Sequence, residues 1–205
     1  SPHHAFDVFT HTAHVTENVP ATLPLRWAAL LHDTGKVPTF CADETGRGHF
    51  YGHAKVSAQL ADTALRRLKA PTALRERVVT LIELHMTKLE PTKKCIRRWL
   101  SRLGLETLED LLTLQQADTG GKGQDRTDEL EQFTVLRTMI KEILAEESCL
   151  SLKDLAVSGN DLLALGFEGR QIGEKLQYLL EQVLDEQLPN EKTALLSALN
   201  KEETL

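Results

Sequence analysis

The sequence contains few cysteines and no long hydrophobic run. Its three cysteines, Cys41, Cys95 and Cys149, are scattered and include no C-x-x-C pair, a pattern that fits buried or half-buried free thiols in a reducing compartment. The longest apolar run, WAALL at 27–31, is far shorter than the roughly 20 residues that span a membrane. No basic and then apolar leader opens the sequence, so we expect a cytoplasmic protein without membrane association.

Glycine, proline and aromatic residues are also scarce. The 205 residues include 12 Gly and 7 Pro, and 5% of them are aromatic. Leu, Ala and Glu are abundant instead, and because these residues favour helices we expect an all-α protein. With 41% hydrophobic residues, a chain of this length can bury one sizeable core and carry a smaller appendage.

The spacing of the apolar residues predicts where the helices lie. The expected helices cover residues 4–18, 25–34, 53–69, 73–88, 93–103, 106–118, 127–147, 170–186 and 191–200. Two polar stretches that contain glycine, 37–51 and 119–125, are predicted loops. A further break at 148–159 divides the chain into an expected helical bundle, 1–147, and a helical tail, 148–205.

Positive charge is concentrated in one block of a chain whose net charge is −6. Residues 66–102 contain eleven Lys and Arg against three Asp and Glu. Inside this block the stretch 93–103 is amphipathic, and its polar face carries Lys94, Arg97, Arg98 and Arg102. Two interpretations stay open for these four residues: an RNA-binding surface for phosphate groups, or a solvated cationic face that balances the acidic helices beside it.

Histidine and aspartate side chains stand on or beside helix faces that should be buried. These residues are His11, His32, Asp33, His53, His85 and Asp118. Residues three and four apart share one face of a helix, so His32 continues the apolar stripe of Ala28 and Ala29. Burying so many unpaired polar groups would be very unfavourable. A shared divalent cation would satisfy all six through imidazole nitrogen and carboxylate oxygen; the alternative is six separate polar groups.

Several stretches carry a family resemblance. The order of the six residues resembles the HD-domain superfamily of metal-dependent phosphohydrolases. More narrowly, HHAFDVFTHT (3–12), LRWAALLHDTGK (25–36), GHAKVSAQLA (52–61) and LQQADTGGKG (114–123) resemble the HD region of bacterial CCA-adding tRNA nucleotidyltransferases. The tail, 155–190, resembles the segment that follows in that family, with one departure: Arg170 stands where a proline commonly follows the glycine.

The resemblance implies a metal site and assigns its ligands. One ion would be held by His11, His32, Asp33 and Asp118. His53 and His85 would complete a second ion that Asp33 bridges, or would contact a substrate phosphate. The metal, with Mg, Mn, Ni, Co and Zn as candidates, would lower the pKa of a bound water. Lys36 would neutralise phosphate charge, while Phe50 and Tyr51 either flank the substrate or pack back onto the core.

The activity implied is hydrolysis of phosphomonoesters or 2′,3′-cyclic phosphates at tRNA ends. Asp33, His53, His85 and Lys36 would be the catalytic residues, and tRNA the partner. The catalytic head of the family holds magnesium with paired aspartates, whereas this sequence has no Asp-x-Asp pair. We therefore expect a fragment of a longer protein, with no nucleotidyltransferase activity of its own. The alternatives are a non-catalytic module that holds tRNA, with a structural or vestigial metal site, and hydrolysis of a free signalling nucleotide.

Overall fold

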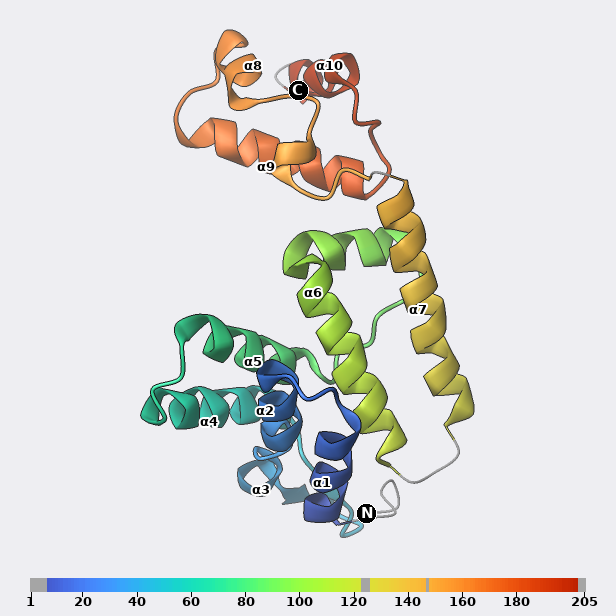
Figure 1. Ribbon diagram of the computed structural model, residues 1–205. Helices are drawn as coiled ribbons and strands as arrows, with labels where there is room; N and C mark the ends of the chain where they lie inside the picture. The colour runs from blue at the N-terminus through green and yellow to red at the C-terminus, as the bar shows by residue number, and fades with distance from the viewer. Residues whose placement is uncertain (1–6, 123–125, 147, 203–205) are drawn as a thin grey trace. The chain divides into compact units, whose positions relative to one another are not determined.

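The computed structural model describes residues 7–122, 126–146 and 148–202 (Figure 1). Their regular structure is helical apart from one two-stranded antiparallel sheet, which confirms the all-α prediction. Within these ranges, no helix has both the length and the apolar character that crossing a membrane requires.

The elements follow one another along the chain in the order labelled in Figure 1. They are α1 (Val8–Asn18), α2 (Leu23–Leu31), α3 (Lys36–Thr39), β1 (Cys41–Ala42), β2 (Gly48–His49), α4 (His53–Arg67), α5 (Thr72–Leu84), α6 (Lys93–Gly120), α7 (Thr127–Ala145), a 3-10 turn (Leu152–Asp154), α8 (Gly159–Ala164), α9 (Arg170–Leu184) and α10 (Lys192–Glu202). The β1–β2 hairpin and all of α3 except Lys36 fall inside the stretch predicted as a loop, because neither shows a periodic apolar pattern.

The described residues form two compact units. The first comprises residues 1–88 and 105–135, and the second comprises 89–104 and 136–205, as far as each is described. The sequence places a single boundary after residue 147, whereas the structure groups 89–104 and the second half of α7 with the tail. Gly104, where α6 passes from one unit to the other, has a φ of +73°. Glycine adopts this left-handed conformation without the steric penalty of a Cβ.

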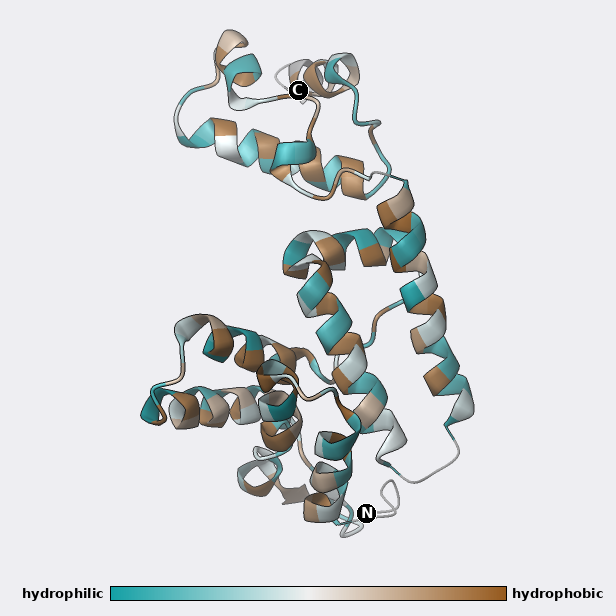
Figure 2. Cartoon of the chain, viewed as in Figure 1, coloured by the Kyte–Doolittle hydropathy of each residue, from teal (hydrophilic) through white to brown (hydrophobic). Residues whose placement is uncertain are grey.

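Packing in the first unit brings the ends of several helices together. α4 packs against α5, α5 against α2, and α2 against α1. These helices carry hydrophobic and hydrophilic residues on different sides (Figure 2), and buried residues such as Ala28, Leu65 and Leu81 fill the space between them. The apolar stripes of α2 and α5 run directly into His32 and His85, which cap the carboxyl ends of these helices.

The second unit has a hydrophobic core of its own. It contains Leu155, Val157, Leu162, Phe167, Leu179, Leu180, Leu184, Leu195 and Leu199. These residues come from α8, α9, α10, the segment between α8 and α9, and the residues directly before α8. Burial of their side chains therefore stabilises the unit independently of the polar residues considered below.

A close approach of α3 to α4 requires glycine at position 35. The N–H of Gly35 donates a 2.8 Å hydrogen bond to Oγ of Ser57, which is buried on α4. A Cβ at position 35 would lie 2.4 Å from the carbonyl oxygen of His53 and 2.6 Å from the backbone nitrogen of Ser57. The φ of Gly35 is −73°, which any residue adopts, so the constraint is steric.

We expect Gly35→Ala to push the start of α4 away from α3 and to displace His53. Strain of this kind typically costs about 1–3 kcal/mol. The measurement is amide hydrogen exchange in α4, which reports the local free energy of opening. Gly120→Ala is the matched control, because a Cβ at Gly120 meets nothing within 4 Å; equal protection of α4 in both variants would contradict the steric argument.

Candidate metal centre

The six histidine and aspartate residues singled out in the sequence lie together in the first unit. They are His11 on α1, His32 and Asp33 directly after α2, His53 at the start of α4, His85 directly after α5, and Asp118 in the last turn of α6. All six are at most 9% exposed. Helix ends thus supply most of the cluster: His32, His85 and Asp118 lie at the carboxyl ends of helices, and His53 begins one.

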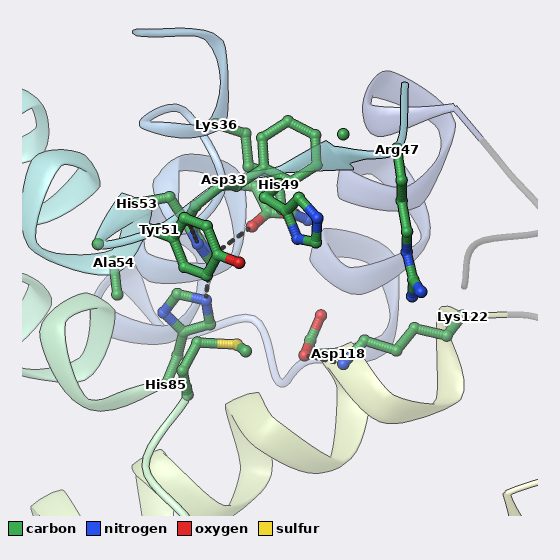
Figure 3. A pocket seen from close by; sticks show the side chains of 14 residues that line it. Asp33, Lys36, Arg47, His49, Tyr51, His53, Ala54, His85, Asp118 and Lys122 are labelled. Carbon is green, nitrogen blue, oxygen red and sulfur yellow. Dashed lines mark hydrogen bonds and ion pairs between the residues drawn. The ribbon is translucent and has the colours of Figure 1, made fainter. Parts of the chain in front are cut away.

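Asp33 stands at the centre of the cluster (Figure 3). Its Oδ2 lies 3.7 Å from Nε2 of His11 and 3.4 Å from Nε2 of His32. Its Oδ1 lies 3.4 Å from Nε2 of His53, which is itself 3.4 Å from Nε2 of His85. The ligand atoms of His11, His32 and Asp33 lie within 4.8 Å of one another, and so do those of Asp33, His53 and His85. Both groups share Asp33.

Asp118 closes the first group from the opposite side. Its Oδ1 lies 2.9 Å from Nε2 of His11 and 3.6 Å from Nε2 of His32. The structure therefore brings together all the residues that the resemblance assigns to one ion, and it places the two remaining histidines beside Asp33.

The backbone fixes which ring nitrogen of each histidine carries a proton. Nδ1 of His11, His32, His53 and His85 lies 2.6–3.1 Å from the carbonyl oxygens of Gly121, Ala29, Phe50 and Ile82, respectively. A carbonyl oxygen only accepts a hydrogen bond, so each Nδ1 must donate one. In the neutral imidazole the other nitrogen, Nε2, then carries a lone pair. The four Nε2 atoms face the space beside Asp33 and Asp118, and that of His11 lies within hydrogen-bond distance, 2.9 Å, of Oδ1 of Asp118.

The surroundings of Nε2 of His32 indicate whether a cation fits this space. Its Nε2 is buried and has no hydrogen-bond partner, and the polar atoms facing it are the carboxylate oxygens of Asp33 and Asp118. A buried acceptor that faces further acceptors is unfavourable unless a positive charge lies between them. Nitrogen and oxygen ligands of this kind suit Zn and the neighbouring transition metals, and also Mn. The residues present therefore fit a divalent cation.

The electrostatic environment of the cluster determines which of its histidine nitrogens and carboxylate oxygens can bind a cation. Burial, together with the charge of His32, lowers the pKa of His85 to about 4, so His85 is neutral at pH 7. Burial raises the pKa of Asp33, but the charges of His32 and Lys36 outweigh it and hold the pKa below its ordinary value. For His32 burial lowers the pKa, yet the neighbouring carboxylates of Asp118 and Asp33 raise it overall. A proton and a cation thus compete for the same nitrogen of His32.

Two lysines pair with the carboxylates of the cluster. Nζ of Lys36 lies 2.6 Å from Oδ2 of Asp33, and Nζ of Lys122 lies 2.8 Å from Oδ2 of Asp118. Burial raises the pKa of Asp118, but the hydrogen bond of His11, the neighbouring His32 and the charge of Lys122 lower it overall. Lys122 did not emerge from the sequence as a site residue, although its spacing of four from Asp118 is the signal that could have identified it.

A cavity of about 460 Å³ opens onto the cluster. It is lined by Asp33, Lys36, Arg47, Gly48, His49, Phe50, Tyr51, Gly52, His53, Ala54, His85, Met86, Asp118 and Lys122 (Figure 3). His11 and His32 are not among the lining residues, so they lie behind the others. The histidines that face the cavity are the cluster members His53 and His85, together with His49 from the loop.

The predicted RNA-binding residues lie in the second unit and have acidic partners there. Lys94 and Arg98 pair with Asp185, and Nη1 of Arg97 pairs with Glu186. Arg102 instead lies over the ring of Trp99, at 5.2 Å from the ring centroid. These intramolecular pairs favour the second interpretation of the basic stretch, a cationic face that balances acidic helices.

Comparison with known proteins gives the family. The A-adding tRNA nucleotidyltransferase of Deinococcus radiodurans is 37% identical over 186 residues, which are 87% of this chain and 43% of that protein. The CC-adding tRNA nucleotidyltransferase of Thermus thermophilus is 36% identical over 167 residues, 78% of this chain and 36% of that protein. The chain thus spans less than half the length of these relatives. A family model described as "tRNA nucleotidyltransferase domain 2 putative" matches residues 49–199, and the chain belongs to this tRNA nucleotidyltransferase family.

Proposed function

We propose that the first unit is a metal-dependent phosphohydrolase of the HD type, within a protein that acts in tRNA 3′-end CCA addition or repair. The observation that carries the proposal is the convergence of the lone pair of His32 Nε2 and the carboxylates of Asp33 and Asp118 without a hydrogen-bond donor to His32. The names of the relatives support the connection to tRNA, which we propose as the partner of the whole protein.

Two sets of residues would hold metal in this proposal. His11, His32, Asp33 and Asp118 would hold one ion, and His53 and His85 would hold a second ion with Asp33 or contact the substrate phosphate. A bound divalent cation supplies Lewis acidity toward a phosphate oxygen and lowers the pKa of water. Because His53 and His85 line the cavity, they are the histidines that a substrate entering it would meet.

The chain supplies further positive charge for a phosphate ester. Lys36, Arg47 and Lys122 line the cavity in addition to the ligand cluster. Their charges offset the negative charge of the phosphate as it approaches the carboxylates. Hydrolysis consumes one water: its oxygen bonds to phosphorus, the ester P–O bond breaks, and the leaving oxygen takes a proton. The substrates that we propose are phosphomonoesters and 2′,3′-cyclic phosphates.

A second reading of the same residues is a module that holds tRNA without catalysis. The absence of an Asp-x-Asp pair supports the proposal that this chain alone does not add nucleotides, and a closed metal site would then have a structural role. The open cavity beside His53 and His85 favours catalysis over this alternative, because a structural site needs no access for a substrate.

Metal binding is the first test of the proposal. We expect Mn²⁺, Ni²⁺ or Co²⁺ to raise the melting temperature of the wild-type chain, since a ligand at 100 times its Kd stabilises the folded state by about 2.7 kcal/mol. Asp33→Ala should abolish this shift and the binding seen by equilibrium dialysis, because Asp33 belongs to both ligand groups. Glu83→Ala, an exposed change on α5, is the matched control. Undiminished metal binding by Asp33→Ala would overturn the assignment.

Turnover is the second test. We expect the wild type to hydrolyse 2′,3′-cyclic AMP or a phosphomonoester with at least one of Mg, Mn, Ni, Co and Zn. Asp33→Ala should lower the rate by at least about 100-fold, the size of effect expected when a residue that orients metal and substrate is lost. His85→Ala should lower kcat while the circular dichroism spectrum stays unchanged. A wild type no faster than Asp33→Ala with every metal would refute catalysis and support the tRNA-holding module.

A further inference from the structure

Two aromatic side chains stand at the mouth of the cavity. The rings of His49 and Tyr51 are stacked, with centroids 5.2 Å apart and planes within 7° of parallel. Both line the cavity, on the side facing Arg47 and Lys122 (Figure 3). Tyr51 is nevertheless 73% exposed. A side chain so exposed adds little to the core, and the flat face of a large aromatic ring is left in contact with water.

The hairpin that carries the stack is fixed by hydrogen bonds within the loop. Oδ1 of Asp43 accepts hydrogen bonds from the backbone N–H groups of Thr45 and Arg47, at 2.9 and 3.0 Å. Oδ2 of the same residue lies 2.7 Å from Nε2 of His49. One carboxylate thus ties the turn between β1 and β2 to the ring of His49. The orientation of the stack is set before any ligand binds, which lowers the entropy cost of binding.

The hairpin is also tied to the floor of the cavity. The ring of Phe50, next to Tyr51, packs against Phe40 with centroids 5.7 Å apart. Nζ of Lys36 lies 5.8 Å from the centroid of the Phe50 ring, and the same Nζ pairs with Asp33. The aromatic wall and the ligand cluster are therefore parts of one connected structure.

The cavity is larger than a phosphate group needs. Its volume of about 460 Å³ lies in the range of small-molecule sites, roughly 300–1,000 Å³. Carboxylates and histidines occupy its floor, lysine and arginine line one side, and stacked rings line another. A ligand that matches all three surfaces has a phosphate ester at one end and a flat aromatic ring at the other. Nucleotides have this structure.

We propose that the His49–Tyr51 stack is a nucleobase-binding wall, which makes nucleotides and RNA 3′ ends the preferred substrates over small phosphate esters. This inference rests on the proposed phosphohydrolase function. A base stacks on an aromatic ring through its π face, which every base has. The wall therefore selects for the presence of a base and tolerates its identity.

The test compares a phosphomonoester that carries a nucleobase with one that has none. Adenosine 3′-monophosphate and glycerol 2-phosphate both lose inorganic phosphate by addition of one water across the ester P–O bond. We expect Tyr51→Ala to lower kcat/KM for the nucleotide about tenfold, mostly through KM, since losing one base–aromatic stack has an effect of this order. Hydrolysis of glycerol 2-phosphate should change less than about twofold, and Tyr51→Trp should restore the preference for the nucleotide. Phe9→Ala, an exposed aromatic change outside the cavity, should leave both substrates unaffected.

The outcomes separate this inference from the proposed function. Equal losses on the two substrates, or no loss on either, would overturn the nucleobase wall while leaving hydrolysis established. If the wild type hydrolyses neither substrate, the proposed function fails, and calorimetric titration with adenosine 3′-monophosphate and with glycerol 2-phosphate decides the inference alone. Tighter binding of the nucleotide that Tyr51→Ala removes would support the wall, whereas equal binding of the two ligands would refute it.

Discussion

The geometry of the candidate metal centre depends on four hydrogen bonds from histidine side chains to the backbone. In each, Nδ1 donates to a carbonyl oxygen close to a helix end or turn. The bond fixes the ring orientation and the proton on Nδ1, so that Nε2 is the acceptor nitrogen of the neutral ring. Three of these bonds are local, spanning three residues, and orient the rings of His32, His53 and His85, whereas the bond from His11 to Gly121 joins α1 to the residues that follow α6. Asp33 and Asp118 lie beside these rings, so a cluster of acceptors forms at the junction of the helices.

The burial of these histidines on apolar helix faces explains how much of the candidate metal centre could be predicted from the sequence. A histidine that continues an apolar stripe, such as His32 after Ala28 and Ala29, must be buried, and its burial can be derived from helical periodicity alone. That reasoning identified the six cluster residues. It did not identify Lys122, although the spacing of four from Asp118 is a helical signal. It could not identify Ser57, whose hydroxyl matters only because Gly35 lies against it, since no periodic pattern relates these two segments.

The loop and the basic stretch show two different limits of sequence reasoning. The β1–β2 hairpin is set by side-chain to backbone hydrogen bonds of Asp43, which are local but not periodic. The basic face of α6 is periodic, but its acidic partners Asp185 and Glu186 are more than eighty residues away in sequence. Periodicity predicts which face of α6 is basic, but it does not predict which residues pair with that face. For the same reason, periodicity predicts one domain boundary after residue 147, whereas ion pairs and packing join residues on the two sides of that position.

The two lysines of the first unit affect which ligand the candidate site favours, because they change the net charge around its carboxylates. Lys36 and Lys122 each pair with one of the two central carboxylates, so these four side chains are together close to neutral. A divalent cation held by the cluster then adds positive charge that no side chain of the cluster offsets, and a low-dielectric surrounding strengthens its attraction for an anion. A phosphate ester supplies the opposite charge and can reach it through the cavity. Without the lysines, the aspartates would neutralise the cation themselves, and the attraction for phosphate would be weaker. In the proposed function, the lysines would therefore make a metal-binding site into one that also favours a phosphate.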